Sequence, residues 1–470
     1  MPTAPNTPTV PTSPTVPPAC SWGAASTVLG VVVLAWPRLS LHVVAMLVGA
    51  WLVLVGLGAA LRGTGLRRRA AAPRRLVPAV ASVLVASVLL AGTAWVHHGD
   101  PRVVPDAFYT PPASVPAEPG RLIRSRAMTA GVPDGLQAWL LLYTTTDGDG
   151  APAVASATVL APGTRPDGAL PVVAVGHGTT GVDPRCAPSL ADEPFADGAG
   201  AALEQAVRSG HVAVTSDYVG LGTAGPHAYL VGPDAAHAVL DAVRAAQELT
   251  AVEVGAQVVA WGHSQGGHAV LWTGMLASDY APELELLGVA AFAPASDLHA
   301  LADGLRTEAI GKLVGAYIAG SWDAAFPDLE VRSQLTPTYG PVVDRITDLC
   351  FTGRDVVAAL ATATQMSREV FGPGALDGPL GQRLRENSPE GTIPVPVLLA
   401  QGDADPLVLP EQQARFVAAR CAEGMTLDSR VYPGLDHLSL VAAGSALTGD
   451  VLEWTEARFA GEPAVAACDG

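Results

Sequence analysis

The chain has 470 residues, of which 49% are hydrophobic, and a formal net charge of −17, so it has material for two or three domains with a large core. The charge is uneven, because the first 104 residues hold eight arginines and one acid, whereas the rest holds 19 basic and 43 acidic residues. This acidic remainder argues against nucleic acid as a partner, since phosphates are bound by basic side chains.

The first 97 residues combine a polar arm with apolar segments. Residues 1–20 are rich in Pro and Thr and are expected to form a disordered arm. Two apolar runs of about 20 residues, 41–61 and 76–96, match the hydrocarbon thickness of a bilayer and predict transmembrane helices. The run 22–36 is shorter and spans only with flanking residues, so the region 21–97 is expected to contain two or three membrane helices.

Six arginines between residues 62 and 75 predict a cytoplasmic loop, since basic loops stay on that side of the membrane. The run 76–96 then leads out of the cytoplasm. We therefore expect a cell-membrane protein whose remaining residues are extracytoplasmic. A cleaved signal peptide fits less well, because no basic segment precedes the first apolar run. A transporter or sensor built on these helices is disfavoured, because their only ionisable side chain is that of His42.

Short apolar runs alternate with helical stretches after a Pro-rich linker over residues 98–120. The runs that predict buried strands are 138–144, 153–160, 171–175, 211–215, 257–261, 286–292 and 395–400. The first two are expected to pair antiparallel, and the others predict an α/β fold with a mostly parallel central sheet. The alternation stops over residues 298–393, where helical periodicity predicts a cap inserted into a core formed by residues 121–297 and 394–470. The alternative is that these helices are extra core helices with no role in substrate handling.

The segment Gly262-His263-Ser264-Gln265-Gly266 carries the pattern G-x-S-x-G. It lies between the apolar run 257–261 and a helical stretch, and a serine on a tight turn between strand and helix is typical of a nucleophile elbow. The two glycines let the strained backbone pass closely without Cβ clashes. We therefore predict Ser264 as a nucleophile, against the alternative of chance in a chain with 50 glycines.

A serine nucleophile needs a histidine base and an acid that orients it, and in the fold with this elbow the chain order is Ser, acid, His. His437 follows a strand-and-turn pattern near the end of the chain and is the predicted base. Asp405, on the turn after the run 395–400, is the predicted acid, with Asp403 as its rival. Asp436 adjoins His437, but neighbouring side chains point apart, so we assign it a loop-forming role.

Acyl transfer also needs N–H donors for the developing oxyanion. The backbone amide of Gln265, directly after the nucleophile, is one predicted donor. The second is expected in the loop 176–181, which reads Gly-His-Gly-Thr-Thr-Gly. Thr179 is the predicted residue there, with Gly178 as the nearest competitor, and a tight turn without this role is the alternative.

From about residue 121 to the C-terminus, the chain resembles the secretory lipase family typified by the fungal lipase A enzymes. The matching motifs are the loop 177–181, Cys186-Ala187-Pro188-Ser189, residues 217–223 and 239–246, the elbow, and the segments around Asp405 and His437. The resemblance implies an α/β-hydrolase fold with a helical cap. It also implies cleavage of carboxylic esters, often of lipids, by Ser264, Asp405 and His437. Asp217 and Tyr218 look like structural or pocket-wall residues.

A second, shorter resemblance covers residues 22–63, which are similar to small membrane proteins of the acid-resistance HdeD type. The segment shares their glycine-spaced apolar helices and a Trp-Pro turn. The membrane helices depart from the usual secreted form of the lipase family.

The expected reaction is the two-step hydrolysis of a small ester or lipid substrate through an acyl-enzyme. In this scheme His437 takes the Ser264 proton and then activates water, and neither a metal nor an organic cofactor is expected. The alternatives are an acyltransferase with the same intermediate and a catalytically silent, membrane-anchored binding module. Apolar residues of the cap segment either line an acyl pocket or pack in an ordinary core: Leu305, Ile310, Leu313, Val314, Tyr317, Ile318 and Trp322.

Four of the five cysteines, Cys186, Cys350, Cys421 and Cys468, lie in the part expected to be extracytoplasmic. An oxidising compartment would allow two disulfides among them, with three possible pairings. Cys20 borders the first apolar run and is expected to be free or lipid-modified, and no cysteine spacing indicates a zinc site.

Overall fold

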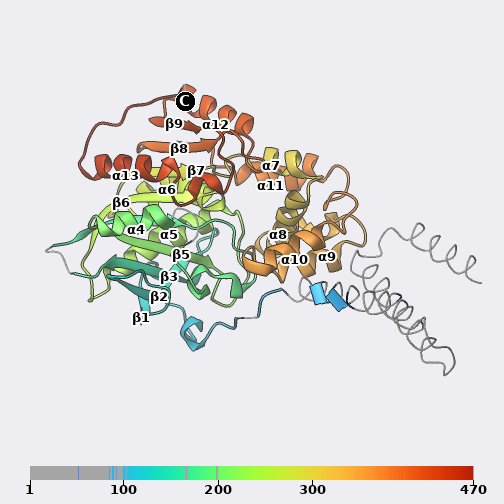
Figure 1. Cartoon of the computed structure of the whole chain (residues 1–470), viewed down its shortest axis with the longest axis horizontal. Helices are drawn as coiled ribbons and strands as arrows, with labels where there is room; N and C mark the ends of the chain where they lie inside the picture. Colours follow the sequence, from blue (N-terminus) through green and yellow to red (C-terminus); the bar gives the residue numbers. More distant parts are fainter. Residues whose placement is uncertain are drawn as a thin grey trace, which may run out of the picture. The chain divides into compact units, whose positions relative to one another are not determined.

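The computed structural model describes residues 99–101, 103–164, 168–196 and 200–468, together with a few isolated residues between 51 and 92. The chain divides into two compact units, Met1–Trp95 and Val96–Gly470, and the elements labelled in Figure 1 belong to the second unit. Among the described residues, no helix has the length and apolar character needed to cross a membrane. The spans predicted at 41–61 and 76–96 fall almost entirely outside these residues.

A nine-stranded sheet forms the centre of the second unit within the described ranges. Its strands are β1 (Leu122–Met128), β2 (Leu136–Thr146), β3 (Pro152–Pro162), β4 (Leu170–Gly176), β5 (Val212–Val219), β6 (Val254–His263), β7 (Glu285–Phe292), β8 (Val397–Gly402) and β9 (Leu427–Tyr432). Their order is β1-β2-β3-β5-β4-β6-β7-β8-β9. The strands β1, β2, β3 and β5 pair antiparallel in succession, and all pairs from β5 to β9 are parallel. The mostly parallel sheet predicted from the sequence is confirmed.

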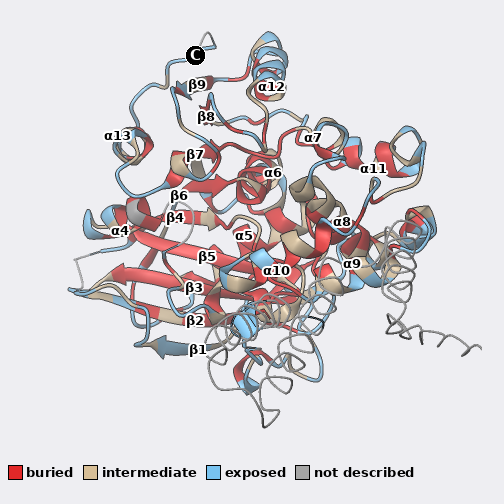
Figure 2. Cartoon of the chain, turned by 45° about the vertical axis from the view of Figure 1, so that its right-hand side comes forward, coloured by how far each residue is buried: buried red, intermediate tan, exposed pale blue. Residues whose placement is uncertain are grey.

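Burial explains why the central strands read as continuous apolar runs. Every residue of β8 is buried, as is all of β5 except its last residue, because parallel strands are covered on both faces. Figure 2 shows the buried residues concentrated along these strands. Strand β1 differs, since all of its residues are intermediate or exposed, and it forms an edge of the sheet. Its polar sequence explains why no apolar run predicted it.

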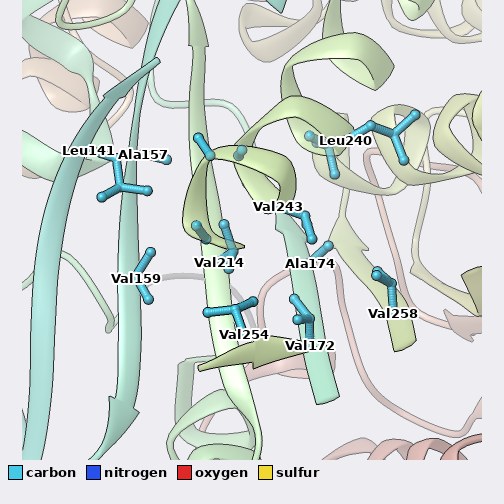
Figure 3. Packing of buried hydrophobic residues seen from close by; sticks show 14 of the residues in the cluster. Leu141, Ala157, Val159, Val172, Ala174, Val214, Leu240, Val243, Val254 and Val258 are labelled. Atoms are coloured by element: carbon cyan, nitrogen blue, oxygen red, sulfur yellow. The ribbon is translucent and has the colours of Figure 1, made fainter. Parts of the chain in front are cut away.

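Helices cover both faces of the sheet. The covering helices are α4 (Gly200–Arg208), α5 (Gly232–Gln247), α6 (Gln265–Tyr280), α12 (Pro410–Ala422) and α13 (Ala446–Phe459). The helices α5 and α6 pack against each other and against the central strands, whereas α4 and α13 form a second helical pair. Figure 3 shows Val243 of α5 beside Ala174 of β4, in a buried apolar cluster that also contains Leu240 and Val172.

A helical insertion separates β7 from β8. Its helices are α7 (Leu298–Leu305), α8 (Ala309–Ala325), α9 (Gly340–Thr347), α10 (Gly353–Ala363) and α11 (Pro379–Glu386). They share an apolar cluster that includes Tyr317, Trp322 and Ile346, together with residues 229–231 from before α5. The insertion therefore packs largely around a core of its own helices, in the region where the sequence predicted helices without a buried strand.

Two disulfides select one of the three pairings left open by the sequence. Cys186 pairs with Cys350, which joins the loop after β4 to the helical insertion. Cys421 pairs with Cys468, which joins the end of α12 to the C-terminal segment. Each bond therefore connects segments that are distant in the chain.

Candidate active site

Ser264 lies on a sharp turn between β6 and α6. Its backbone has φ 57° and ψ −117°, a region that a non-glycine residue occupies only with strain. A Cβ on Gly262 would collide with the Gly266 carbonyl, and a Cβ on Gly266 would collide with the Gly176 carbonyl of the neighbouring strand. The two glycines of the motif therefore permit the close backbone contacts of this turn, as predicted.

Asp405 is the candidate acid that the structure brings to His437. Its Oδ2 accepts a hydrogen bond from His437 Nδ1 at 2.8 Å, while Oδ1 accepts from the backbone amides of Leu407 and Val408 at 2.8 and 3.0 Å. A carboxylate can only accept these bonds, so the Nδ1 atom carries the imidazole proton and Nε2 remains a base. The Asp405 side chain is fully buried, which shields this pair from water.

The two other acids near this turn point elsewhere. Asp403 is exposed, and its Oδ1 accepts a hydrogen bond from the Gly434 amide at 2.6 Å. Asp436 accepts bonds from Ser439 and the Leu438 amide, and the Ser439 bonds lower its pKa. Both carboxylates shape loops, in agreement with the loop-forming role predicted for Asp436.

Ser264 and His437 line one cavity, yet their side chains are not joined by a hydrogen bond. The cavity has a volume of about 680 Å³ and is also lined by Thr179 and Gln265. Within the described part of the chain, the Ser264 hydroxyl has no hydrogen-bond partner. Such catalytic contacts are often long without substrate and tighten when it binds, so the geometry is compatible with a base that closes on the serine.

The predicted oxyanion donors face the same cavity from two elements. Gln265 is the first residue of α6, where helix amides have no partner within the helix, and Thr179 follows β4. Among the described residues, the amides of Gln265, Thr179 and Gly178 have no hydrogen-bond acceptor. Both alternatives for the second donor therefore stay open, and the helix N-terminus favours negative charge at this position.

His263 is a residue whose contact with the base the sequence did not reveal. Its Nε2–H donates to the backbone carbonyl of His437 at 2.9 Å, and the two imidazole rings lie 4.5 Å apart. Burial, and next the neighbouring His437, lower the pKa of His263 to about 3, so the ring stays neutral at neutral pH. The position directly before Ser264 was part of the motif, but no local pattern indicates a contact with a residue 174 positions away.

A second group of buried residues fixes the loop that carries Thr179. The Tyr218 hydroxyl donates to the His177 carbonyl at 3.1 Å, and His177 Nε2 bonds to the Asp217 carbonyl at 3.2 Å. The Asp217 carboxylate accepts from the hydroxyls of Ser156 and Ser189 and from the Ser189 amide. Asp217 and Tyr218 thus have a structural role, which is one of the two roles that the resemblance implied.

The helical insertion supplies much of the apolar wall of the cavity. Of the seven apolar residues singled out in the sequence, Leu305, Ile310 and Val314 line this cavity. Leu313, Tyr317 and Trp322 are fully buried in the core of the insertion, and Ile318 lines a second cavity of about 200 Å³. The seven residues therefore divide between cavity lining and core, and those of α8 lie on different faces of that helix.

The chain is similar to known lipases over most of its length. The family described as "Secretory lipase" matches residues 201–467, and a "Short repeat of unknown function (DUF308)" matches residues 22–91. Lipase 6 of Candida albicans is 25% identical over 403 residues, covering 77% of this chain and 83% of the relative. A probable inactive lipase of Mycobacterium tuberculosis is 26% identical over 390 residues, covering 76% and 82%.

A solved structure shares the fold. The structure of Candida antarctica lipase A in its closed state superimposes with a TM-score of 0.63 at 21% identity, covering 78% of this chain and 90% of that chain. The likeness shows an α/β-hydrolase-like fold with a mostly parallel sheet. Because the family match also spans more than half of the residues, the chain belongs to the secretory lipase family.

Proposed function

We propose that this protein is a membrane-tethered, extracytoplasmic serine hydrolase that cleaves carboxylic esters with apolar acyl chains. Membership of the secretory lipase family gives lipase or esterase chemistry. The observation that carries the finer proposal is the buried hydrogen bond of 2.8 Å between Asp405 and His437, in one cavity with Ser264 on its strained turn. The apolar runs at 41–61 and 76–96 support the membrane attachment.

The reaction we propose uses three side chains, Ser264, His437 and Asp405, and two backbone amides. His437 Nε2 removes the hydroxyl proton as Ser264 Oγ bonds to the ester carbonyl carbon, and Asp405 stabilises the resulting imidazolium. Amides of Gln265 and of Thr179 or Gly178 donate to the oxyanion. The imidazolium then gives its proton to the departing alcohol. In the second step His437 activates a water that releases the acid and restores Ser264.

The size and lining of the cavity support a substrate with an apolar acyl chain. A volume of about 680 Å³ lies within the usual range for small-molecule sites, which are mostly apolar with a few polar groups. The wall contributed by the helical insertion contains Leu305, Ile310, Val314, Phe351 and Leu360. We therefore assign the insertion the role of a cap over the acyl part of the substrate.

The test compares wild type with two serine variants in full-length protein purified in detergent. Ser264→Ala is expected to lower kcat on p-nitrophenyl esters on the order of 10⁶-fold and to abolish labelling by a fluorophosphonate probe. Ser296→Ala is the matched control, because Ser296 also follows a neighbouring strand of the sheet, but it is buried and bonds to Gln413 at 3.0 Å. This control is expected to retain labelling and most of its activity.

Two observations favour a second candidate, a binding module without catalysis. A relative carries the name of a probable inactive lipase, and the hydroxyl of Ser264 has no hydrogen bond to His437 in the described part of the chain. Folded wild-type protein that neither reacts with the probe nor hydrolyses any ester would favour this candidate over the hydrolase.

A further inference from the structure

We propose that Asp100 is a positioning residue for the substrate cavity and acts through helix α10. The inference rests on the proposed function, because the cavity is the one that holds Ser264 and His437. Asp100 follows the apolar run 76–96 by four positions, so it would connect the membrane-proximal segment with the acyl wall of the cavity.

Asp100 caps α10 from a distant part of the chain. Its Oδ2 accepts hydrogen bonds from the Arg354 and Asp355 amides at 2.6 and 3.3 Å, and its Oδ1 accepts from Arg354 Nε at 2.8 Å. The residue at the N-cap position, Thr352, makes no side-chain cap bond. The first amides of a helix need such acceptors and favour a negative charge. Asp100 therefore takes the role that a local N-cap residue has in most helices.

The close fit of two glycines supports a specific contact. Gly353 begins α10 with φ +53°, and a Cβ there would collide with the Asp100 carboxylate. A Cβ on Gly99 would collide with Asp355 Oδ1. Burial raises the pKa of Asp100, but the hydrogen bonds from Arg354 and Asp355 lower it by more, so the carboxylate is charged at neutral pH.

Asp355 extends this contact toward the loop that holds the predicted oxyanion donor. Its Oδ1 accepts from the Asp100 amide at 2.7 Å, and its Oδ2 accepts from the Cys350 amide at 3.0 Å. The same Oδ2 pairs with the Arg185 guanidinium at 2.8 Å. Both side chains of this ion pair are at least nine-tenths buried, and Cys350 is bonded to Cys186. The start of α10 is thus attached both to the segment of Asp100 and to the loop after β4.

The residues at the start of α10 contact the cavity directly. Phe351, Thr352, Val356 and Leu360 all line it. The Phe351 amide also donates to the carbonyl of Thr180 at 2.7 Å, next to the predicted donor Thr179. A shift of α10 and of the two residues before it would therefore move these four lining residues together and change the acyl wall.

The experiment compares Asp100→Ala with Asp106→Ala in the full-length protein. Asp106 is a matched control, because it also caps a helix by accepting from the Phe108 amide at 2.9 Å and pairs with Arg126 at 2.6 Å. Its partners lie at the edge strand β1 and the short helix Ala107–Tyr109, not on α10. The two variants remove the same charge and the same kind of cap from neighbouring positions.

For Asp100→Ala we expect kcat/KM on p-nitrophenyl dodecanoate to fall about fivefold, the factor of a typical lost helix cap, while the value on p-nitrophenyl acetate stays unchanged. Asp100→Asn should lower kcat/KM on the dodecanoate ester by a smaller factor, because the amide oxygen still accepts a hydrogen bond. Asp106→Ala should leave the ratio of long-chain to short-chain rates at the wild-type value. Titration with a fluorophosphonate probe normalises each rate to folded, reactive protein.

A binding measurement separates this inference from the proposed chemistry. In Ser264→Ala protein, the Kd for a dansyl-labelled undecanoic acid should rise about fivefold on adding Asp100→Ala and stay constant on adding Asp106→Ala. Equal Kd values and equal ratios of long-chain to short-chain rates in Asp100→Ala and Asp106→Ala would overturn the role of Asp100. A uniform loss of kcat/KM on all esters, in proportion to the loss of Tm, would overturn it as well. Wild type without any esterase activity would refute the proposed function, while the binding comparison would still decide the role of Asp100.

Discussion

The two walls of the substrate cavity are held in place by different means. The sheet wall, which carries Ser264 and His437, is formed by the end of β6 and by the loops after β8 and β9. The helical wall is formed by α8 and α10, and the start of α10 is attached by a disulfide, a buried ion pair and the cap from Asp100. The sheet wall is fixed by the register of parallel strands, whereas the helical wall depends on a few contacts between distant segments. We expect substitutions in the first to affect the chemistry and those in the second to affect the choice of substrate.

The largest effect is expected on the sheet wall, at Asp405. Asp405→Asn should lower kcat on p-nitrophenyl butyrate on the order of 10⁴-fold, because the amide no longer holds His437 in the tautomer with a free Nε2. Asp403→Asn should change kcat by no more than about twofold, since its carboxylate is exposed and accepts a hydrogen bond from the Gly434 amide, away from His437. A large loss of kcat in Asp403→Asn with little loss in Asp405→Asn would show that Asp403, and not Asp405, is the acid.

A smaller effect on the same wall is expected at His263. His263→Phe removes the hydrogen bond to the His437 carbonyl, and we expect kcat to fall about three- to tenfold with KM unchanged. The matched control is His268→Phe, because His268 is also buried and its Nε2 donates to a backbone carbonyl, that of Asn387, at 2.7 Å. His263→Gln should recover part of the rate through its amide N–H. Equal losses of kcat in His263→Phe and His268→Phe would mean that His263 contributes through packing alone and does not position His437.

His263 also gives the sheet wall a defined sensitivity to acid. Its folded pKa of about 3 lies below the ordinary value of 6.5, so below pH 6.5 the unfolded chain binds a proton that the folded chain does not. The stability that His263 contributes is therefore present above pH 6.5 and lost as the pH falls toward 3. From pH 7.5 to 5 this group alone accounts for up to about 2 kcal/mol. His263→Phe should accordingly lose less Tm over this range than wild type.

The same division between the walls explains what the sequence could predict. The elbow at Ser264 depends on local features, namely an apolar strand, two glycines and a helix, and the structure has this arrangement. The chain order of Ser264, Asp405 and His437 also rests on strand-and-turn patterns that can be read locally. The paired glycines matter because Gly262 and Gly266 remove Cβ atoms that would otherwise meet backbone carbonyls. These parts required no knowledge of distant contacts.

The helical wall was less predictable because its contacts join residues far apart in the chain. Asp100 and Arg354 are separated by 254 positions, and Cys186 and Cys350 by 164. At such separations, no spacing in the sequence indicates that the two residues of either pair meet. The periodicity of α8 predicted an apolar helix but did not separate its cavity face from its core face. Packing against the rest of the insertion makes that distinction, with Val314 on one side and Leu313 on the other.

The smallest effect on activity is expected from the disulfides, which offer a direct comparison of the two regions. Loop-closure entropy gives about 5 kcal/mol for the bond Cys186–Cys350 and about 4 kcal/mol for Cys421–Cys468, from sequence separations of 164 and 47. Replacing either pair with alanine should therefore lower Tm by comparable amounts. Stability alone does not distinguish the two bonds, so the informative measurement is the rate on esters of different chain length.

Only the bond at Cys350 adjoins residues that line the cavity. Its removal should lower the ratio of dodecanoate to acetate hydrolysis by less than the fivefold change expected for Asp100→Ala, because the Asp100 cap and two further contacts still keep α10 in place. The two further contacts are the ion pair of Asp355 with Arg185 and the hydrogen bond from the Phe351 amide to Thr180. The variant without Cys421–Cys468 should keep the wild-type ratio, since this bond fixes the C-terminal segment near β9. A changed ratio in the variant without Cys421–Cys468, with an unchanged ratio in the variant without Cys186–Cys350, would contradict this prediction. It would mean that the contacts around α10 do not set the position of the helical wall.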